Sequence, residues 1–258
     1  MTMLTSFSDT SSDTLTVAII GATGGIGSAI IEHLAHEPTV KTLYCGSRAP
    51  FDTSVYENVN ATVRSFSIDI TNEVSVKKAA EFIADNGDAV DVVIVATGLL
   101  HDDKGLRPEK SLQQLQADNF LKNMLVNALG PALVAKHFLP LINKNKRSFF
   151  GAFSARVGSI SDNGLGGWHS YRASKAANNM LIKNIAIEYK RKCPYLIVAG
   201  LHPGTVDTEL STPFQKNVKP EKLFTPEFSA KQILSVIDKL SESDSGNCFA
   251  WDGRQIPA

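Results

Sequence analysis

What the chain lacks narrows the classes of protein to which it can belong. Among 258 residues there are three cysteines, and Lys plus Arg total 26 against 26 for Asp plus Glu. Cys45, Cys193 and Cys248 form no close pair, so the sequence supports neither a disulfide framework nor a zinc motif. A balanced charge gives no positive field for nucleic acid or an anionic membrane. We expect a cytoplasmic protein with no nucleic-acid partner and no bound metal.

Long apolar runs are also missing. No segment approaches the roughly 18 consecutive apolar residues that span a bilayer, so we expect no membrane partner. Residues 1–14 are rich in Ser, Thr and Asp and lack the basic start and apolar centre of a signal peptide. No repeat or Pro/Gly-rich linker divides the rest. The sequence predicts a flexible polar tail over 1–14 and one domain over 15–258.

Short apolar runs alternate with longer amphipathic stretches, as in strand–helix units around a parallel sheet. The runs expected to be strands are 15–20, 39–44, 62–68, 90–95, 148–153, 195–201 and 248–251. The stretches with helical periodicity are 26–36, 74–86, 118–139, 168–192 and 226–240. The pattern predicts a single-domain Rossmann fold: a doubly wound, seven-stranded parallel sheet with helices on both faces. Residues 99–117 and 205–224 follow strand ends, where such sheets bind ligands, and are expected to wall the substrate site.

A glycine-rich turn joins the first expected strand to the first expected helix. It contains Gly21, Thr23, Gly24, Gly25 and Ile26, followed by Gly27. Glycines let the main chain bend sharply and approach a pyrophosphate, and the helix N-terminus favours its charge. A mononucleotide loop would need a lysine before its hydroxyl residue, and none precedes Ser28. The turn predicts a dinucleotide site.

The end of the second strand bears on which dinucleotide binds. Folds that prefer NAD place an acid here for the ribose 2′-hydroxyl, whereas a guanidinium suits a 2′-phosphate. This chain has Ser47 and Arg48, and Arg48 lies 21 positions after Gly27. NADP(H) is therefore favoured, while the nearby Asp52 keeps NAD(H) open as the alternative.

Tyr171 and Lys175 are four residues apart at the start of a helical stretch, so both side chains lie on one face. A phenol titrates near pH 10, and a neighbouring ammonium is expected to lower its pKa. Tyr171 could then donate a proton to a carbonyl oxygen as hydride arrives. Such a pair taken alone is usually a surface feature, and it is the glycine turn upstream that favours a catalytic role.

With these elements in order, the chain resembles the short-chain dehydrogenase/reductase family. The resemblance rests on the glycine turn, Asp69-Ile70, Ala96-Thr97-Gly98, Asn127, the Tyr171/Lys175 pair and Pro203-Gly204. Residues 154–160, 202–208 and 249–253 resemble the group that contains the C-factor proteins and the sniffer-type carbonyl reductases.

The resemblance implies further roles. Asp69 and Ile70 would lie beside the adenine, and Ala96, Thr97 and Gly98 along the ribose and nicotinamide. Tyr171 and Lys175 would contact the cofactor as well as act in catalysis, and Asn127 would hold a water that links Lys175 to solvent. Pro203, Gly204 and Thr205 would close over the nicotinamide, with Thr205 or Thr208 bonding its carboxamide or phosphates.

One position departs from the family pattern. The family normally ends its fifth strand with two serines, of which the second binds the substrate carbonyl, and here that second position is Ala155. Ser154 or Ser159 could supply the hydroxyl instead, and Ser154 is the residue we predict.

The sequence thus predicts an NADPH-dependent reductase of a ketone or aldehyde, with Asn127, Ser154, Tyr171 and Lys175 as catalytic residues. An NADP-binding regulatory protein of the C-factor type is the alternative, and a dinucleotide-dependent epimerase or dehydratase ranks last. The long helices over 118–139 and 168–192 resemble those that pair in family oligomers, so a homodimer or homotetramer is expected.

Overall fold

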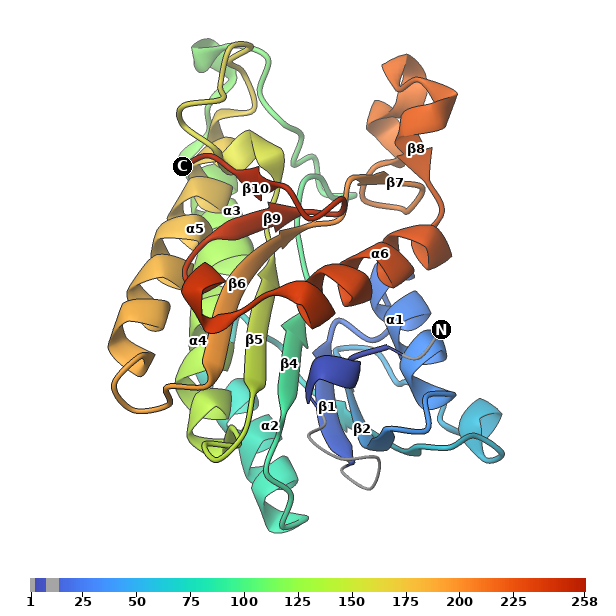
Figure 1. The fold of residues 1–258 in the computed structure, drawn as a ribbon. Helices are drawn as coiled ribbons and strands as arrows, with labels where there is room; N and C mark the ends of the chain where they lie inside the picture. The colour runs from blue at the N-terminus through green and yellow to red at the C-terminus, as the bar shows by residue number, and fades with distance from the viewer. Residues whose placement is uncertain (1–2, 8–13) are drawn as a thin grey trace.

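The centre of the structure is one β-sheet. The computed structural model describes residues 3–7 and 14–258. Eight strands lie in the order β10-β9-β6-β5-β4-β1-β2-β3, and every neighbouring pair is parallel except β10 and β9 (Figure 1). The strands are β1 Leu15–Ile20, β2 Val40–Ser47, β3 Thr62–Ser67, β4 Val92–Val95, β5 Ser148–Phe153, β6 Leu196–His202, β9 Cys248–Ala250 and β10 Gln255–Ile256.

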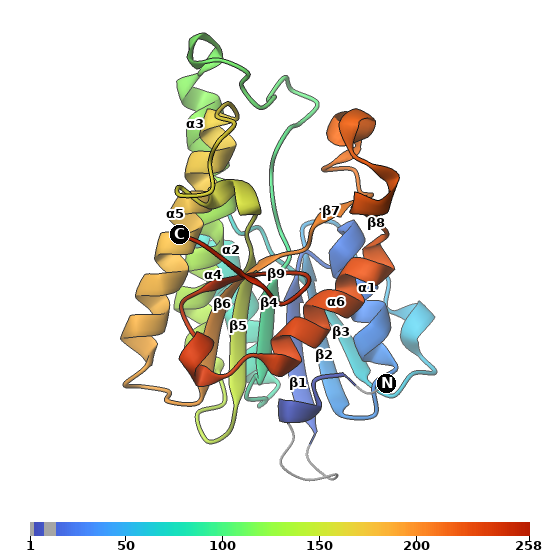
Figure 2. The ribbon, with the colours of Figure 1, turned by 45° about the horizontal axis from the view of Figure 1, so that its top comes forward.

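Helices cover both faces of the sheet (Figure 2). Helices α1 and α6 pack together on one face, and α2, α4 and α5 lie on the other. The helices are α1 Gly25–Ala35, α2 Glu73–Asp85, α3 Ala117–Met124, α4 Gly130–Phe138, α5 His169–Tyr189 and α6 Pro226–Lys239. The predicted Rossmann-type α/β fold is confirmed.

The strand count needs one correction. All seven expected parallel strands are present, but β10 adds an eighth, antiparallel strand at the edge beside β9. Its two residues are too few to show the alternation that marks a strand in a sequence. Two further short strands, β7 Thr205–Val206 and β8 Leu223–Phe224, pair with each other outside the main sheet.

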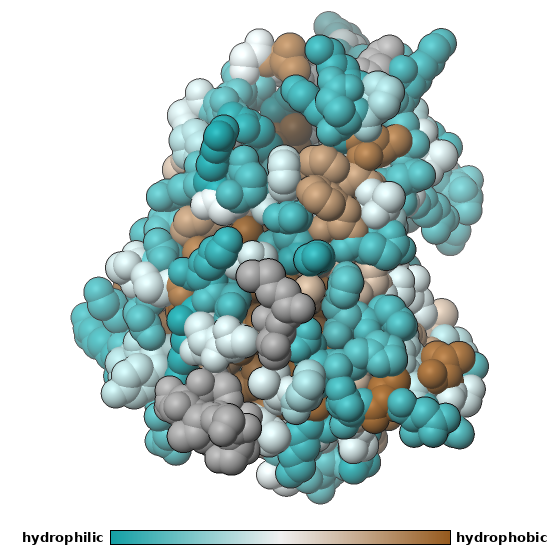
Figure 3. Space-filling view, turned by 45° about the vertical axis from the view of Figure 1, so that its right-hand side comes forward, coloured by the Kyte–Doolittle hydropathy of each residue, from teal (hydrophilic) through white to brown (hydrophobic). Residues whose placement is uncertain are grey.

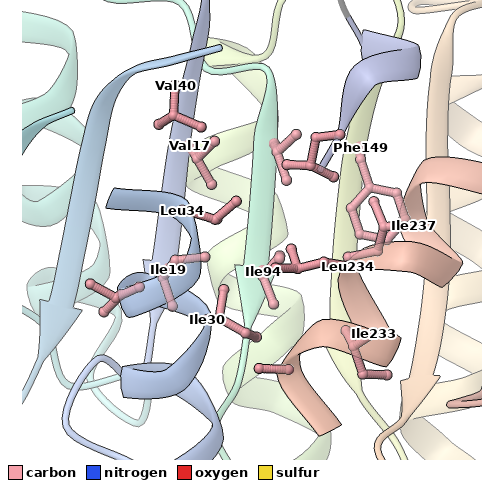
Figure 4. Close-up of a cluster of buried hydrophobic side chains, with 14 of the residues drawn as sticks. Val17, Ile19, Ile30, Leu34, Val40, Ile94, Phe149, Ile233, Leu234 and Ile237 are labelled. Carbon is pink, nitrogen blue, oxygen red and sulfur yellow. The ribbon is translucent and has the colours of Figure 1, made fainter. Parts of the chain in front are cut away.

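Alternation along the strands sends apolar side chains into both layers. Val17 and Ile19 of β1 join the cluster under α1 and α6, whereas Ala18 and Ile20 join the cluster under the other helices. Figure 4 shows the first cluster, where the helices meet the sheet through Ile30, Leu34, Ile233, Leu234 and Ile237. Burying one such aliphatic side chain contributes about 1.5–3 kcal/mol, so packing on both faces holds the sheet in place.

The expected helix over 118–139 is interrupted. A π-helical turn, Leu125–Leu129, separates α3 from α4. Pro131 has no N–H to donate to the carbonyl of Asn127 four residues earlier, which removes one α-helical hydrogen bond where the helix widens. Such turns are frequent at functional sites.

One helical stretch of the described chain, Ala117–Leu141, has the length and apolar composition of a membrane span. The core helices of soluble proteins pass the same test, and this stretch packs against α2 and α5 within the layered fold. On the face shown in Figure 3, hydrophilic residues dominate and hydrophobic ones lie in small separate groups.

Part of the N-terminal segment is anchored to the domain. Leu4 and Phe7 are buried, the Arg147 guanidinium lies 4.5 Å from the centre of the Phe7 ring, and the Ser6 N–H donates to Asp238 Oδ1 at 2.8 Å. This packing differs from the flexible tail expected over 1–14, because its apolar residues reach the core. Residues 1–2 and 8–13 lie outside the described residues.

Candidate active site

Four segments converge at the carboxyl edge of the sheet. A Cβ placed on Gly98, after β4, would lie 3.7 Å from Asn127 Oδ1 and 3.9 Å from Lys175 Nζ. The Lys175 ammonium donates to the Phe153 carbonyl at the end of β5 at 2.8 Å. Tyr171 lies one turn before Lys175 on α5. Residues from β4, the π-helical turn, β5 and α5 therefore form one constellation.

The glycine turn leaves the start of α1 open. Gly21 has φ +101°, and a Cβ on Gly27 would lie 2.1 Å from the Gly21 carbonyl oxygen, so both positions require glycine. Gly24 caps α1 without a side-chain hydrogen bond, and Thr23, Gly24 and Gly25 are exposed. Uncapped N–H groups at a helix N-terminus attract an anion, so this turn fits a pyrophosphate.

The segment after β6 lies against the same turn. A Cβ on Gly25 would lie 2.7 Å from Thr208 Cγ2. Gly204 has φ +85° and faces the Phe224 ring, and the Pro203 carbonyl accepts a hydrogen bond from Ser229 of α6 at 2.9 Å. Thr205 pairs with Leu223 in the small second sheet. These contacts place residues 203–208 beside the predicted phosphate site.

Beyond β2 and β3, several polar groups are held in local turns. Ser47 Oγ donates to the Ala49 carbonyl at 2.5 Å, and Asp69 Oδ1 accepts from the Thr71 N–H at 2.9 Å. Hydrogen bonds from Thr71 lower the pKa of Asp69, and the charge of Arg48 lowers it further. Arg48 is exposed near Asp69, where it is available to an anionic ligand. Asp52 instead accepts from Ser54, whose hydrogen bonds lower the pKa of Asp52.

Ile70 and Ala96, which are also predicted to contact the cofactor, differ in how they lie in the structure. The Ile70 side chain is buried, and a Cβ on Gly130 would lie 2.7 Å from it, so only the Ile70 main chain can face a ligand. The Ala96 N–H continues the sheet by donating to the Ile20 carbonyl at 2.8 Å.

Thr97 carries a buried hydroxyl, Oγ1, that has no hydrogen-bond partner in the described part of the chain. Its methyl group lies 3.2 Å from where a Cβ of Gly21 would be. A buried polar group without a partner is costly, so a ligand that supplies one would be stabilised here. The site therefore fits a dinucleotide that runs from the glycine turn toward Lys175.

Burial dominates the titration of Tyr171 and Lys175. Tyr171 is 8% exposed and Lys175 is 2% exposed, and the Lys175 ammonium lies 5.8 Å from the centre of the Tyr171 ring. Burial lowers the pKa of Lys175 to about 8 and raises the pKa of Tyr171 above its ordinary value. The direction of the Tyr171 pKa shift is therefore opposite to the lowering expected from Lys175, because burial decides it. Tyr171 is protonated at neutral pH, the form that a proton donor needs.

Asn127 ties two of these segments together. Its Nδ2 donates to the Leu99 carbonyl at 2.8 Å and to Ser174 Oγ at 3.1 Å, and its Oδ1 accepts from the Leu99 N–H at 2.8 Å. The amide is fully buried and satisfied. It fixes the chain after β4 against α5, which carries Lys175.

The hydroxyl of Ser154 is committed elsewhere. It donates to Asn179 Oδ1 at 2.5 Å, two turns beyond Tyr171 on α5, and the Cys248 thiol donates to the same oxygen. Ser159 Oγ accepts from the Asp162 N–H at 3.1 Å.

His202, at the end of β6, is another residue that could donate a proton. Burial lowers the pKa of His202 to about 4, so its side chain is neutral at pH 7 and is less suited than Tyr171 to act as the acid.

The sequence pattern did not single out Glu109. Charges between His101 and Lys110 suggest a solvated loop, but Glu109 is 4% exposed and its carboxylate accepts from the Ser170 N–H and hydroxyl. Glu109 is therefore buried although the charged residues around it are typical of a solvated loop. Gly166 and Gly167, which both have positive φ, form the turn before α5 against which Glu109 lies.

Among the residues that the structure describes, no three His, Cys, Asp or Glu side chains come together to hold a metal ion. The site is formed instead by Tyr171, Lys175, Asn127 and the glycine turn. Over the same region the sequence matches a known pattern: residues 15–219 match the description "short chain dehydrogenase". The chain belongs to the short-chain dehydrogenase family. It is an NAD(P)-dependent oxidoreductase of that family.

Relatives agree over nearly the whole chain. An uncharacterized oxidoreductase of Schizosaccharomyces pombe is 26% identical over 93% of this chain and 96% of its own length. The 1-hydroxy-2-glutathionyl-2-methyl-3-butene dehydrogenase of a Rhodococcus species is 29% identical over 92% and 97%. The NADPH-bound carbonyl reductase from chicken fatty liver has the same fold, with a TM-score of 0.81, 23% identity and coverage of 95% of this chain and all of that one.

The resemblance to the C-factor and sniffer group is supported only in part. The C-signal protein of Myxococcus xanthus is 30% identical, but over only 53% of this chain and 76% of its own length. The carbonyl reductase Sniffer of Drosophila melanogaster shares the fold, with a TM-score of 0.78 and 20% identity over 95% of this chain and all of that one. The match to the family extends over residues 15–219, whereas the match to the C-signal protein extends over about half of the chain.

Proposed function

We propose that this enzyme reduces the carbonyl group of a ketone or aldehyde with NADPH. The observation that carries the proposal is the buried pair on α5: a protonated Tyr171 one turn before Lys175, whose ammonium lies at the same strand ends as Gly98 and Asn127. When bound, NADPH would supply the hydride that reduces the carbonyl carbon. Tyr171 then donates its proton to the carbonyl oxygen, so the alkoxide charge never accumulates. In the same step, the Lys175 ammonium stabilises the phenolate left behind.

The residues proposed to hold the cofactor follow the edge of the sheet. The glycine turn would hold the pyrophosphate, and Arg48 with Ser47 would hold the 2′-phosphate. Arg48 is exposed near Asp69, whereas the competing Asp52 is occupied by Ser54. The complete set is Gly21, Thr23, Gly24, Gly25, Ile26, Ser47, Arg48, Asp69, Ile70, Ala96, Thr97, Gly98, Tyr171, Lys175, Pro203, Gly204 and Thr205.

Asn127 is proposed to support a proton relay from Lys175 to solvent. Its side-chain amide is fully engaged, so the main-chain carbonyl is the group that would bind a water. Pro131 cannot donate to that carbonyl, which leaves an acceptor at the π-helical turn. A carbonyl at this point suits a water that returns protons to Lys175.

Ser154 remains the proposed partner of the substrate oxygen only if its hydroxyl leaves Asn179 when substrate binds. Ala155, at the position where the family usually has a serine, contributes no hydroxyl. We therefore assign most of the carbonyl activation to Tyr171 and Lys175.

The enzyme is also proposed to form a homodimer or homotetramer in the cytoplasm. Met180 and Ile187 of α5 and Leu129 before α4 are exposed apolar residues. A hollow of about 430 Å³ between these helices is lined by Leu181 and Ile185 among others. Pairing of these helix faces between two copies would cover this apolar surface.

An NADP-binding regulatory protein with little turnover is the second candidate. Ala155 favours it, because the usual carbonyl-binding hydroxyl is missing, and so does the partial match to the C-signal protein. The buried Tyr171 and Lys175 argue against it, since burying a lysine is costly and a regulatory role makes no use of one.

The two candidates are separated by Tyr171→Phe, which removes only the phenolic hydroxyl. Oxidation of NADPH by a panel of aldehydes and ketones should fall about 10²- to 10⁴-fold, while NADPH affinity stays nearly unchanged. Tyr189→Phe, at the other end of α5, is the matched control and should behave like the wild type. Tight NADPH binding without turnover in any of the three proteins would favour the regulatory candidate.

A further inference from the structure

Three aromatic side chains extend outward from Tyr171. The Trp168 ring lies 6.2 Å from the Tyr171 ring between centroids, at an interplanar angle of 71°. Phe214 lies 5.2 Å from Trp168, and His101 lies 5.7 Å from Phe214. They come from the start of α5 and from the segments 205–224 and 99–117, which Figure 2 shows beyond the same end of the sheet. Trp168, Phe214 and His101 are partly exposed, so they offer aromatic surface beside the buried Tyr171.

The main chain holds Trp168 in an unusual conformation. Trp168 has φ 51° and ψ 41°, in the left-handed region that a bulky residue rarely adopts. Gly166 and Gly167 before it both have φ +64°. A residue stays in such a conformation only when its surroundings hold it there, and such positions concentrate at ligand sites.

Glu109 supplies that hold. Its main-chain carbonyl accepts from the Trp168 N–H at 2.5 Å, and its carboxylate accepts from the Ser170 N–H at 3.2 Å and from the Ser170 hydroxyl. Trp168 caps α5 without a side-chain hydrogen bond of its own, so Glu109 caps this helix from a remote loop. One buried residue therefore fixes Trp168 next to Tyr171.

A second contact joins the two outer segments. His101 Nε2 lies 3.1 Å from the Glu209 carbonyl oxygen, within hydrogen-bond distance. Together with the Trp168–Phe214 contact, this links both irregular segments to the start of α5. The aromatic surface has a defined position because Phe214 contacts both Trp168 and His101, and His101 is also held by the Glu209 carbonyl.

We propose that Trp168, held by Glu109, is the specificity-determining residue of the substrate site, and that it selects carbonyl groups conjugated to a flat aromatic ring over those on saturated rings. This inference rests on the proposed reductase function. A substrate whose carbonyl oxygen meets Tyr171 has its substituent near Trp168. A planar ring can pack on the indole face or edge there, whereas a puckered saturated ring cannot make the same contact. Glu109 acts as a positioning residue for Trp168.

The test compares two aldehydes of equal ring size, benzaldehyde and cyclohexanecarbaldehyde. The ratio of their kcat/KM values is measured with NADPH for the wild type, Trp168→Leu and Trp168→Phe. Taking the ratio within each protein cancels general loss of activity. The ratio should fall about five- to tenfold in Trp168→Leu and stay near the wild-type value in Trp168→Phe. Leu165→Ala, an exposed position in the same loop, is the control and should leave the ratio unchanged.

Two variants examine the role of Glu109. Glu109→Ala should lower the same ratio while NADPH affinity is retained, and Ser170→Ala should do so more weakly. If Trp168→Leu does not fold, Phe214→Leu gives the same readout from a neighbouring segment. An unchanged ratio in the leucine variants would overturn the proposal.

Failure of the reductase function itself gives a different result. If the wild type turns over neither aldehyde, affinities for benzyl alcohol and cyclohexylmethanol are measured by calorimetry with NADP⁺ present. Tighter binding of benzyl alcohol that is lost in Trp168→Leu supports the specificity role without turnover. Equal binding of the two alcohols by the wild type overturns it.

Discussion

On the β1 side of the carboxyl edge, the groups expected to meet the cofactor come from short turns at strand ends. Around Tyr171, by contrast, the groups come from segments far apart in the chain. Glu109 reaches α5, Phe214 packs against Trp168, and His101 packs against Phe214. In the first region, glycines and main-chain N–H groups form most of the predicted binding surface. In the second region, contacts between side chains of different loops form the surface. The predicted cofactor region is thus built from residues that are close together in the sequence. The predicted substrate region is built from residues that only the tertiary structure brings together.

The largest effect should come from breaking the main-chain region at Gly27. In Gly27→Ala the new Cβ would clash with the Gly21 carbonyl oxygen. Because this oxygen belongs to the main chain, no side-chain rotation can relieve the clash. We expect NADPH affinity to fall about a hundredfold or more and the free energy of unfolding to fall by about 1–3 kcal/mol. Calorimetric titration and chemical denaturation measure the two effects. Gly164→Ala, with open space around it, should change neither.

Arg48→Ala sharpens the comparison at the adenosine end. If Arg48 binds the 2′-phosphate, the preference for NADPH over NADH in kcat/KM should fall about ten- to a hundredfold, because a hydrogen bond between charged groups is lost. Arg191→Ala, an exposed arginine after α5, serves as the control. A preference that survives in Arg48→Ala would assign the selection to another residue.

The pKa of Lys175 predicts a pH dependence in the side-chain region. Because burial lowers this pKa to about 8, kcat/KM for reduction should fall as the pH rises through 8, about tenfold per further unit, as the ammonium is lost. In Lys175→Arg the charge persists, so any residual activity should show no fall near pH 8. A flat profile for the wild type between pH 7 and 9.5 contradicts the prediction.

The free energy of unfolding should rise with pH above pH 8, where kcat/KM is expected to fall. Below pH 8 the folded protein carries a buried charge at a cost of up to about 3 kcal/mol. Between about pH 8 and 10.5 the unfolded chain keeps a proton that the folded protein has released, so folding becomes more favourable as the pH rises. The difference in free energy of unfolding between Lys175→Met and the wild type should shrink over this range.

The smallest effect is expected at Ser154. Because its hydroxyl donates to Asn179, Ser154→Ala should lower kcat only a few-fold and reduce stability by about 1 kcal/mol. Rate and denaturation measurements on the same protein decide between a catalytic and a structural role. A loss of kcat as large as that of Tyr171→Phe would show that the hydroxyl turns to the substrate.

The features that the sequence predicts correctly are mostly local, like the glycine turn, whereas those that it misses depend on distant segments, like the surroundings of Tyr171. The conformation of the glycine turn and the shared helix face of Tyr171 and Lys175 depend on neighbours within one turn or one helix, so the sequence spacing predicts both. The sheet was also predictable, because buried parallel strands are nearly continuous apolar runs. The two-residue β10 and the π-helical turn were not, since each depends on packing or on a single proline rather than on a period.

Residues whose surroundings are built by distant parts of the chain escaped sequence analysis. Glu109 has the composition of a solvated loop and becomes buried only when that loop meets α5. The pKa of Tyr171 was expected to fall because Lys175 is four residues away, but the extent of burial, which sequence spacing does not report, decides its direction. The position of Ser154 in the sequence predicts a role at the substrate oxygen, whereas its hydroxyl donates to Asn179, which also accepts from Cys248.

The short antiparallel strand β10 has a consequence for how copies of this protein can meet. An edge strand with a long row of unpaired N–H and carbonyl groups invites another chain to extend the sheet, which is a common start of aggregation. Here β10 covers β9 and is only two residues long, so an incoming strand would find very few main-chain partners. Uncontrolled growth of the sheet is disfavoured at this edge.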